Sequence, residues 1–120
     1  MNRKVLLIED NEQNLYLETF ILEKHGYIVV QARTGPEGIE LAKKIEPDMI
    51  LLDIQLPVMD GYVVAGELRK ILTKKKIPII AITSFAMPGD REKALAAGCA
   101  DHITKPINPD TFITSIEKYF

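Results

Sequence analysis

The sequence predicts an α/β protein, built as a doubly wound, five-stranded parallel sheet with five helices. Short apolar runs alternate five times with helical patterns along 120 residues, and the connections between them are short. The runs that begin at Lys4, Met49 and Pro78 are almost continuously apolar, which is typical of strands buried on both faces of a parallel sheet. A single domain over residues 1–120 is therefore expected.

The first half of the chain predicts two strand–helix units. The strand Lys4–Ile8 precedes a helix over Asn11–Lys24, with Asn11 as its N-cap. The β-branched stretch Tyr27–Ala32 predicts a second strand, and Thr34–Ile45 a second helix that stops before Pro47. The apolar residues of the first helix are Leu15, Leu17, Phe20, Ile21 and Leu22.

The middle of the chain contains the run Met49–Leu52, which leads directly into Asp53. Pro57 and Gly61 close this segment, as expected of a buried strand bounded by turn residues. A third helix is predicted over Tyr62–Leu72. Its residues expected to face the core are Val63, Leu68 and Ile71.

Two further strand–helix units complete the chain. Strands are predicted at Pro78–Thr83 and Ala100–Thr104, and helices at Pro88–Ala97 and from Asn108 onward. The apolar side of the last helix consists of Phe112, Ile113, Ile116, Tyr119 and Phe120.

Composition and charge argue against several classes of function. A formal charge of −2 gives no reason to expect binding to nucleic acid or to an anionic membrane. The dense basic run Lys74–Lys76 is expected on a solvated loop. Cys99 is the only cysteine, which excludes a disulfide framework and fits a reducing compartment. No stretch resembles a membrane span or a signal sequence, so a cytoplasmic location is expected.

Polar side chains follow four of the predicted strands. In the doubly wound order 2-1-3-4-5, strands one and three are neighbours, so Glu9, Asp10 and Asp53 are expected to meet. Their meeting point is the carboxyl edge of the sheet, where ligands bind in this architecture. Thr83 and Lys105, from strands four and five, are expected at the same edge.

Three converging carboxylates favour a bound cation, because like charges that lie close together destabilise an empty site. Oxygen ligands match Mg²⁺, and no cluster of His or thiol ligands points to zinc. A metal, a hydroxyl and an ammonium around an oxygen nucleophile are the groups that phosphoryl transfer requires. Asp53 is the natural nucleophile and would form an acyl phosphate.

Each of these residues also has a purely structural interpretation. Glu9 and Asp10 could start a helix, and Asp53 could close a turn or cap a helix. Thr83 could be an ordinary strand-end hydroxyl, and Lys105 a surface residue. Their joint position at the strand ends of one sheet is what favours a functional site.

The sequence resembles the receiver domain of two-component response regulators over its whole length. Details of its loops also resemble receivers of hybrid histidine kinases and single-domain regulators of bacterial cell-division phosphorelays. The resemblance implies a flavodoxin-like fold. The matching segments are Glu9-Asp10, Asp53 after Ile50–Leu52, Leu56–Gly61, Thr83 and Lys105-Pro106, with Asp10–Asn14, Asp53–Pro57 and Phe85–Asp90 as the finer matches.

The resemblance implies a phosphorylation-dependent signalling switch. Asp53 would accept a phosphoryl group from a phosphohistidine of a sensor histidine kinase or histidine phosphotransferase, in a Mg²⁺-dependent reaction. Asp10, Asp53 and the backbone carbonyl of Gln55 would ligate the ion, with Glu9 acting partly through water. The domain would catalyse its own phosphorylation and slow dephosphorylation without being a turnover enzyme.

The resemblance also implies how the signal leaves the site. Thr83 would turn inward to hydrogen-bond the phosphoryl group, Lys105 would pair with it, and the Lys105–Pro106 peptide would be cis. A downstream protein would then read the surface of the last two helices and strand five. The family commonly has Tyr or Phe at the switch position, and His102 stands there, which puts the usual aromatic switch in doubt. The alternative is that His102 is an ordinary half-exposed strand residue.

Three other functions are known to use similar folds or sites, and each conflicts with a feature of this sequence. Aspartate-dependent phosphatases place a second Asp two residues after the nucleophile as general acid and base, and Gln55 stands there instead. A degenerate receiver used only for docking would not need the intact acid, Thr and Lys set. Flavin binding would need a phosphate-cradling loop after the first strand. The chain ends with its last helix, so no DNA-binding output domain is expected.

Overall fold

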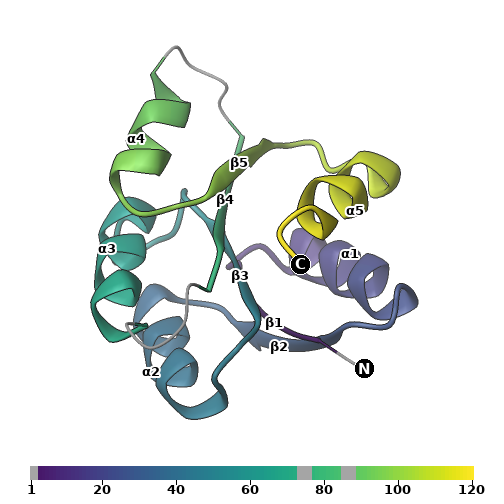
Figure 1. Cartoon of the computed structure of the whole chain (residues 1–120), viewed down its shortest axis with the longest axis horizontal. Coiled ribbons are helices and arrows are strands. Elements are labelled where there is room, and N and C mark those ends of the chain that lie inside the picture. Colours follow the sequence, from purple (N-terminus) through teal and green to yellow (C-terminus); the bar gives the residue numbers. More distant parts are fainter. Residues whose placement is uncertain (1–2, 73–76, 85–88) are drawn as a thin grey trace.

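The computed structural model describes residues 3–72, 77–84 and 89–120. Strands and helices alternate along the whole described chain (Figure 1). The elements are β1 (Lys4–Ile8), α1 (Glu12–Lys24), β2 (Ile28–Ala32), α2 (Gly35–Ile45), β3 (Met49–Asp53), α3 (Gly61–Ile71), β4 (Ile79–Thr83), α4 (Asp90–Ala96), β5 (Asp101–Thr104) and α5 (Pro109–Glu117).

The five strands form one parallel sheet in the order β2-β1-β3-β4-β5, which confirms the predicted fold class. Ile8 at the end of β1 pairs with Leu52, and Asp53 at the end of β3 pairs with Ile82. This register brings the carboxyl ends of β1, β3 and β4 to the same edge of the sheet.

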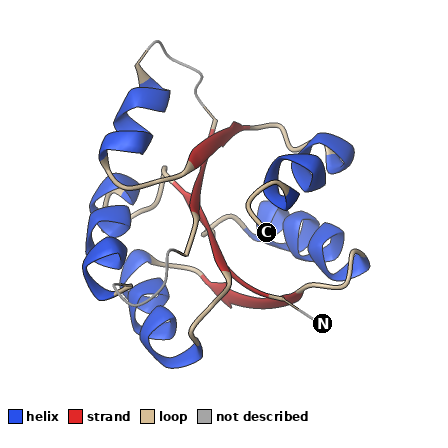
Figure 2. Cartoon of the chain, viewed as in Figure 1, coloured by secondary structure: helices blue, strands red, loops and turns tan. Residues whose placement is uncertain are grey.

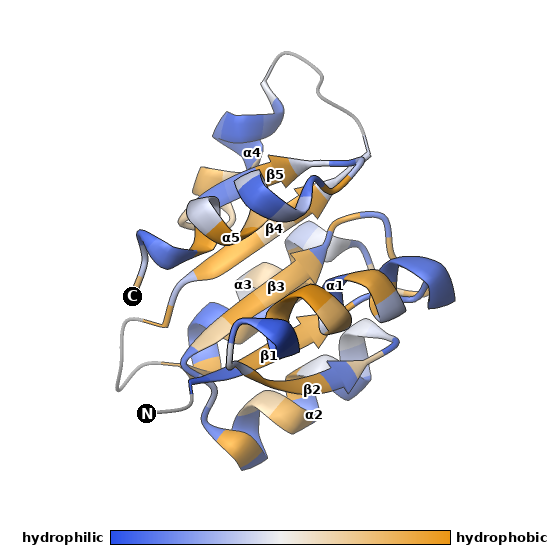
Figure 3. Ribbon diagram, turned by 90° about the vertical axis from the view of Figure 1, so that its right-hand side faces the viewer, coloured by the Kyte–Doolittle hydropathy of each residue, from blue (hydrophilic) through white to orange (hydrophobic). Residues whose placement is uncertain are grey.

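Helices cover both faces of the sheet. Helices α1 and α5 lie on one face and α2, α3 and α4 on the other (Figures 1 and 2). Successive residues of β1 point to opposite faces, so Val5 and Leu7 pack under α1 and α5, whereas Leu6 and Ile8 pack in the other core. The central strands are the most hydrophobic part of the ribbon in Figure 3. Burial of each Leu or Ile side chain contributes roughly 1.5–3 kcal/mol to the stability of the folded protein.

Side-chain caps begin four of the helices. Asn11, Thr34, Asp60 and Asn108 each accept a hydrogen bond from a backbone N–H of the first helical turn. Such a cap stabilises a helix by about 1 kcal/mol. The caps at Asn11 and Asp60 lie next to the carboxyl edge of the sheet, so they also fix the chain around the acidic residues.

The loop between β3 and α3 is fixed by Gly61. Its N–H donates to the carbonyl of Ile54 at 3.1 Å, and a Cβ on Gly61 would lie 2.4 Å from the Ile54 Cα. This close approach lies at the first residue of α3. Val64 and Leu68 are buried, whereas Val63 is 52% exposed. The prediction that Val63 faces the core is therefore wrong.

Element boundaries differ from the predictions by one or two residues. The helix predicted over Pro88–Ala97 spans Asp90–Ala96, with Ala97 as its C-cap. The last helix ends at Glu117, so the prediction that Tyr119 and Phe120 belong to its apolar side is wrong. Pro88 itself, the basic run Lys74–Lys76 and most of the segment Phe85–Asp90 lie outside the described residues. Within the part of the chain that is described, no helix combines the length and the apolar character needed to cross a membrane.

Candidate functional site

Three carboxylates converge at the carboxyl edge of the sheet, as the sequence predicts. Glu9 and Asp10 directly follow β1, and Asp53 ends β3. One carboxylate oxygen from each lies within 4.8 Å of the others. Glu9 and Asp53 are buried, whereas Asp10 is exposed, so solvent reaches the cluster from the side of Asp10.

Lys105 brings an ammonium group into this acidic cluster. Its Nζ donates to Glu9 Oε1 at 3.0 Å and to Asp53 Oδ2 at 3.3 Å. The Lys105 backbone N–H donates to the carbonyl of Thr83 at 2.7 Å, which holds the loop after β5 against the end of β4. The peptide bond between Lys105 and Pro106 is cis, as the resemblance implied.

The charges in the cluster are not balanced. Burial, together with the neighbouring Asp53 carboxylate, raises the pKa of Glu9 to about 7 against the opposing effect of Lys105. Burial alone would lower the pKa of Lys105, but its hydrogen bond to Glu9 and the charge of Asp53 raise that pKa above its ordinary value. The single positive charge of Lys105 therefore cannot offset the carboxylates of Glu9, Asp10 and Asp53. A bound divalent cation would reduce the remaining repulsion between them.

A fourth acid, Glu18 on α1, was not predicted to belong to this region. Its side chain is fully buried, and neither carboxylate oxygen has a hydrogen-bond partner within the described part of the chain. Burial, together with the charge of Glu9, raises the pKa of Glu18 to about 8 against the opposing charge of Lys105. The sequence carried a signal for this position, because Leu15, Glu18 and Leu22 share one face of the helix.

The Gln55 side chain joins the ends of β3 and β4. Its backbone N–H donates to Asp53 Oδ1 at 2.9 Å. The side-chain Nε2 donates to Thr83 Oγ1 at 2.8 Å, and the side-chain Oε1 accepts from the Ser84 N–H at 3.0 Å. Sequence reasoning gave Gln55 only a backbone role, so these two side-chain contacts are new.

His102 lies on β5 opposite Ala81 and is half-buried. Its Nδ1 is buried and has no hydrogen-bond partner among the described residues. Its backbone N–H donates to the carboxylate of Asp101, which also accepts from the Tyr119 hydroxyl at 2.8 Å and from Arg91 at 3.1 Å. Asp101 thus links β5 to α4 and to the turn that follows α5, around the position proposed for the switch.

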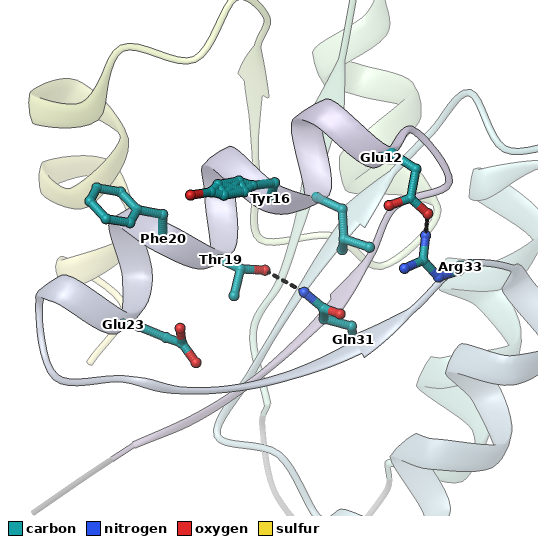
Figure 4. Close-up of a pocket in the computed structure, with 8 residues that line it drawn as sticks. Glu12, Tyr16, Thr19, Phe20, Glu23, Gln31 and Arg33 are labelled. Atoms are coloured by element: carbon teal, nitrogen blue, oxygen red, sulfur yellow. Dashed lines mark hydrogen bonds and ion pairs between the residues drawn. The ribbon is translucent and has the colours of Figure 1, made fainter.

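An exposed apolar surface lies on α1. Tyr16, Leu17 and Phe20 are 66%, 39% and 55% exposed, and the rings of Tyr16 and Phe20 stack with centroids 6.5 Å apart. We call these three residues the α1 aromatic face. Figure 4 shows Tyr16 and Phe20 beside a surface hollow, at whose far end Glu12 pairs with Arg33. Helix α1, which carries this surface, begins at Glu12, two residues after Asp10.

Comparison with known proteins identifies the family. Residues 5–117 match the model of the response regulator receiver domain. The chain belongs to the response regulator receiver family. Phosphorylation-dependent signalling, through sensor kinases or phosphotransferases, is the general function of receiver domains, so the protein serves signalling rather than metabolism.

Individual relatives support this assignment. The chain is 41% identical over 119 residues to the polar-differentiation response regulator DivK of Brucella ovis, covering 99% of this chain and 97% of DivK. A receiver domain of the sensor histidine kinase PA1611 from Pseudomonas aeruginosa shares 34% identity and a TM-score of 0.90, covering 99% of this chain and 98% of that one. Its structure is described with a magnesium ion coordinated in the active site cleft. Chemotaxis protein CheY4 of Vibrio cholerae shares 28% identity and a TM-score of 0.94 over the full length of both chains.

Proposed function

We propose that Asp53 is the residue that accepts the phosphoryl group in this receiver domain. The observation that carries the proposal is the setting of its carboxylate, which is buried at the carboxyl edge beside the Lys105 ammonium and the carboxylates of Glu9 and Asp10. The Lys105 ammonium, together with a bound divalent cation, would neutralise negative charge on a phosphoryl group attached to Asp53. Asp53 also ends the central strand of the sheet, so its backbone is held rigidly.

The donor set fits Mg²⁺. Glu9, Asp10 and Asp53 offer carboxylate oxygens within 4.8 Å of one another, and we add the backbone carbonyl of Gln55 as a further oxygen ligand. A bound Mg²⁺ would neutralise charge on the phosphoryl oxygens and hold them in place. The magnesium ion coordinated in the related PA1611 receiver supports this assignment.

The chemistry proposed at Asp53 is a displacement at phosphorus. A carboxylate oxygen of Asp53 forms the new bond to phosphorus, while the phosphorus–nitrogen bond of a phosphohistidine breaks and its electron pair returns to the imidazole. Lys105 pairs with the transferred group, and the Thr83 hydroxyl donates to it. Slow attack of water on the same phosphorus then regenerates the carboxylate, so the domain catalyses both steps without turnover of a small substrate.

A sensor histidine kinase or histidine phosphotransferase is the proposed donor, acting in the cytoplasm. A protein that presents its phosphohistidine to Asp53 must cover the rim of the acidic cluster, where α1 begins. We therefore assign the α1 aromatic face to contact with the donor, because exposed Tyr, Leu and Phe side chains gathered on one helix are typical of interaction surfaces.

The proposed output surface is formed by α4, β5 and α5. Thr83 pairs with Thr104 in the sheet, and Ala81 pairs with His102, so movement at the end of β4 is passed to β5 directly. The Asp101 carboxylate then connects β5 to α4 through Arg91 and to the turn after α5 through Tyr119. A downstream protein would read the resulting change.

Incubation with Mg²⁺ and acetyl phosphate, followed by intact-mass measurement, tests the proposed function. We expect the wild-type protein to gain one phosphoryl group and Asp53→Asn to gain none, because an amide is a far weaker nucleophile. Chelation of Mg²⁺ should prevent the gain in wild type. Equal gains in the two proteins would show that the acceptor lies elsewhere.

A further inference from the structure

The Gln55 side chain is hydrogen-bonded to two groups at the end of β4, the Thr83 hydroxyl and the Ser84 backbone N–H. Its amide donates to Thr83 Oγ1 at 2.8 Å, and its carbonyl accepts from the Ser84 N–H at 3.0 Å. We call this pair of hydrogen bonds the Gln55 bridge. Both geometries lie within the ordinary range for strong amide hydrogen bonds.

The Gln55 bridge lies beside the acceptor carboxylate. Gln55 follows Asp53 by two residues, its backbone N–H donates to Asp53 Oδ1, and Asp53 pairs with Ile82 directly before Thr83. The bridge therefore spans the gap between the ends of β3 and β4 on the outer side of the site, where Gln55 is exposed.

A phosphoryl group on Asp53 would weaken both hydrogen bonds of the Gln55 bridge. Its oxygens are strong acceptors, so they compete with the Gln55 carbonyl for the Ser84 N–H. The Thr83 hydroxyl accepts from Gln55 and is expected to turn toward the phosphoryl group as a donor, which would carry Oγ1 away from the Gln55 amide. The Ser84 N–H cannot make a full hydrogen bond to both Gln55 and a phosphoryl oxygen.

We propose that the Gln55 bridge is a positioning device that keeps Thr83 and Ser84 in their unphosphorylated arrangement and opposes phosphorylation until it breaks. This inference rests on Asp53 being the acceptor. It makes Gln55 a residue that sets how readily the domain is phosphorylated, in addition to the metal-ligand role proposed for its backbone carbonyl.

The decisive variant is Gln55→Met, which keeps the length of the side chain and removes both hydrogen bonds. Phosphorylation by acetyl phosphate at saturating Mg²⁺ should become about tenfold faster, as expected when two hydrogen bonds of ordinary net strength no longer oppose it. Binding of beryllium fluoride should tighten by a similar factor. The affinity for Mg²⁺ should not change, because the backbone carbonyl of Gln55 remains. Faster phosphorylation with unchanged Mg²⁺ affinity would not result from a general loss of structure.

The structure offers a matched control in Gln31. Its Nε2 donates to the hydroxyl of Thr19 at 2.9 Å, which is the same type of contact on an exposed site between β2 and α1. Gln31→Met should therefore phosphorylate at the wild-type rate. A readout without any phosphoryl donor is hydrogen exchange at the Ser84 amide, which Gln55→Met should accelerate and Gln31→Met should not.

Each outcome decides the inference. A Gln55→Met protein that phosphorylates at the wild-type rate or more slowly overturns the role of the bridge while leaving Asp53 as the acceptor. An unchanged Ser84 exchange rate overturns the contact itself. Failure of the wild-type protein to take up any phosphoryl group overturns both the inference and the proposed function.

Discussion

Replacement of Glu18 by leucine should stabilise the protein, and more at neutral pH than at acid pH. Glu18 is fully buried, its carboxylate has no hydrogen-bond partner within the described residues, and Glu9 and Asp53 add repulsion. Leucine is apolar, and Leu15 and Leu22 on the same helix face are already buried. The substitution therefore removes an unpaired ionisable group from the core.

The size of the effect follows from the difference in pKa between the folded and unfolded chain. The pKa of Glu18 is about 8 in the folded protein, where burial raises it, and near 4.5 when the chain is unfolded. Below pH 4.5 both states are protonated, so the pKa difference costs nothing. As pH rises from 4.5 to about 8 the unfolded chain releases its proton first and stability falls. At pH 7 the cost is about 3 kcal/mol, against about 1 kcal/mol at pH 5.

Urea unfolding of metal-free wild type and Glu18→Leu at pH 5 and pH 7 measures this difference. The gain in unfolding free energy should be larger at pH 7 by about 2–3 kcal/mol. Glu23→Leu is the control, because Glu23 is exposed on the same helix and its replacement should give no comparable pH dependence. An equal gain at both pH values, or a destabilised Glu18→Leu protein, would refute the reasoning.

Three further predictions concern the metal site, the switch and the donor surface. In metal-free protein, Asp10→Asn should raise the free energy of unfolding by up to about 1 kcal/mol by relieving repulsion among the carboxylates, and a variant that melts at a lower temperature than wild type would contradict this. Added Mg²⁺ should stabilise wild type more than the variant. His102→Tyr should enlarge the chemical-shift response of α4, β5 and α5 to beryllium fluoride, because a larger aromatic ring at this half-buried position follows a movement of Thr83 more closely than imidazole does. Identical shifts in wild type and the variant would make His102 a bystander. The double variant Tyr16→Ser, Phe20→Ser should accept phosphate from a histidine phosphotransferase about tenfold more slowly, whereas its reaction with acetyl phosphate should keep the wild-type rate. If both reactions slow equally, the α1 aromatic face does not contact the donor.

Most of the fold could be predicted from local patterns. The apolar runs of β1, β3 and β4 are fully buried, and the caps at Asn11, Thr34 and Asn108 begin helices as their residue types indicate. Alternating strands and helices with short connections leave few topologies, so the convergence of acids at one edge followed from strand order.

The errors and omissions have two sources, helical spacing and tertiary contacts. Val63 is expected in the core as an apolar residue, but it is exposed, because Val64 and not Val63 lies one helical turn before the buried Leu68. Leu17 and Phe20 are apolar and exposed, while the charged Glu18 between them is buried. Composition alone cannot reveal that a charged residue is buried and its apolar neighbours exposed. The helical spacing indicates it, because Glu18 shares a face with the buried Leu15 and Leu22.

The side-chain role of Gln55 could not be predicted from the sequence. Its partners, Thr83 and Ser84, are far away along the chain, and the contact depends on how the ends of β3 and β4 meet. The resemblance to receiver domains supplied a role for the Gln55 backbone only. Long-range side-chain contacts of this kind require the structure.

The most direct test of the central claim is to locate the phosphoryl group after reaction with Mg²⁺ and acetyl phosphate. Borohydride reduces an acyl phosphate to the alcohol, so peptide mapping after reduction should find homoserine at position 53 and at no other acidic residue. The same treatment of Asp53→Asn should leave every peptide unmodified. Modification of Asp10 or Glu9 in place of Asp53, or a phosphoryl group that survives borohydride, would contradict the assignment of Asp53 as the acceptor.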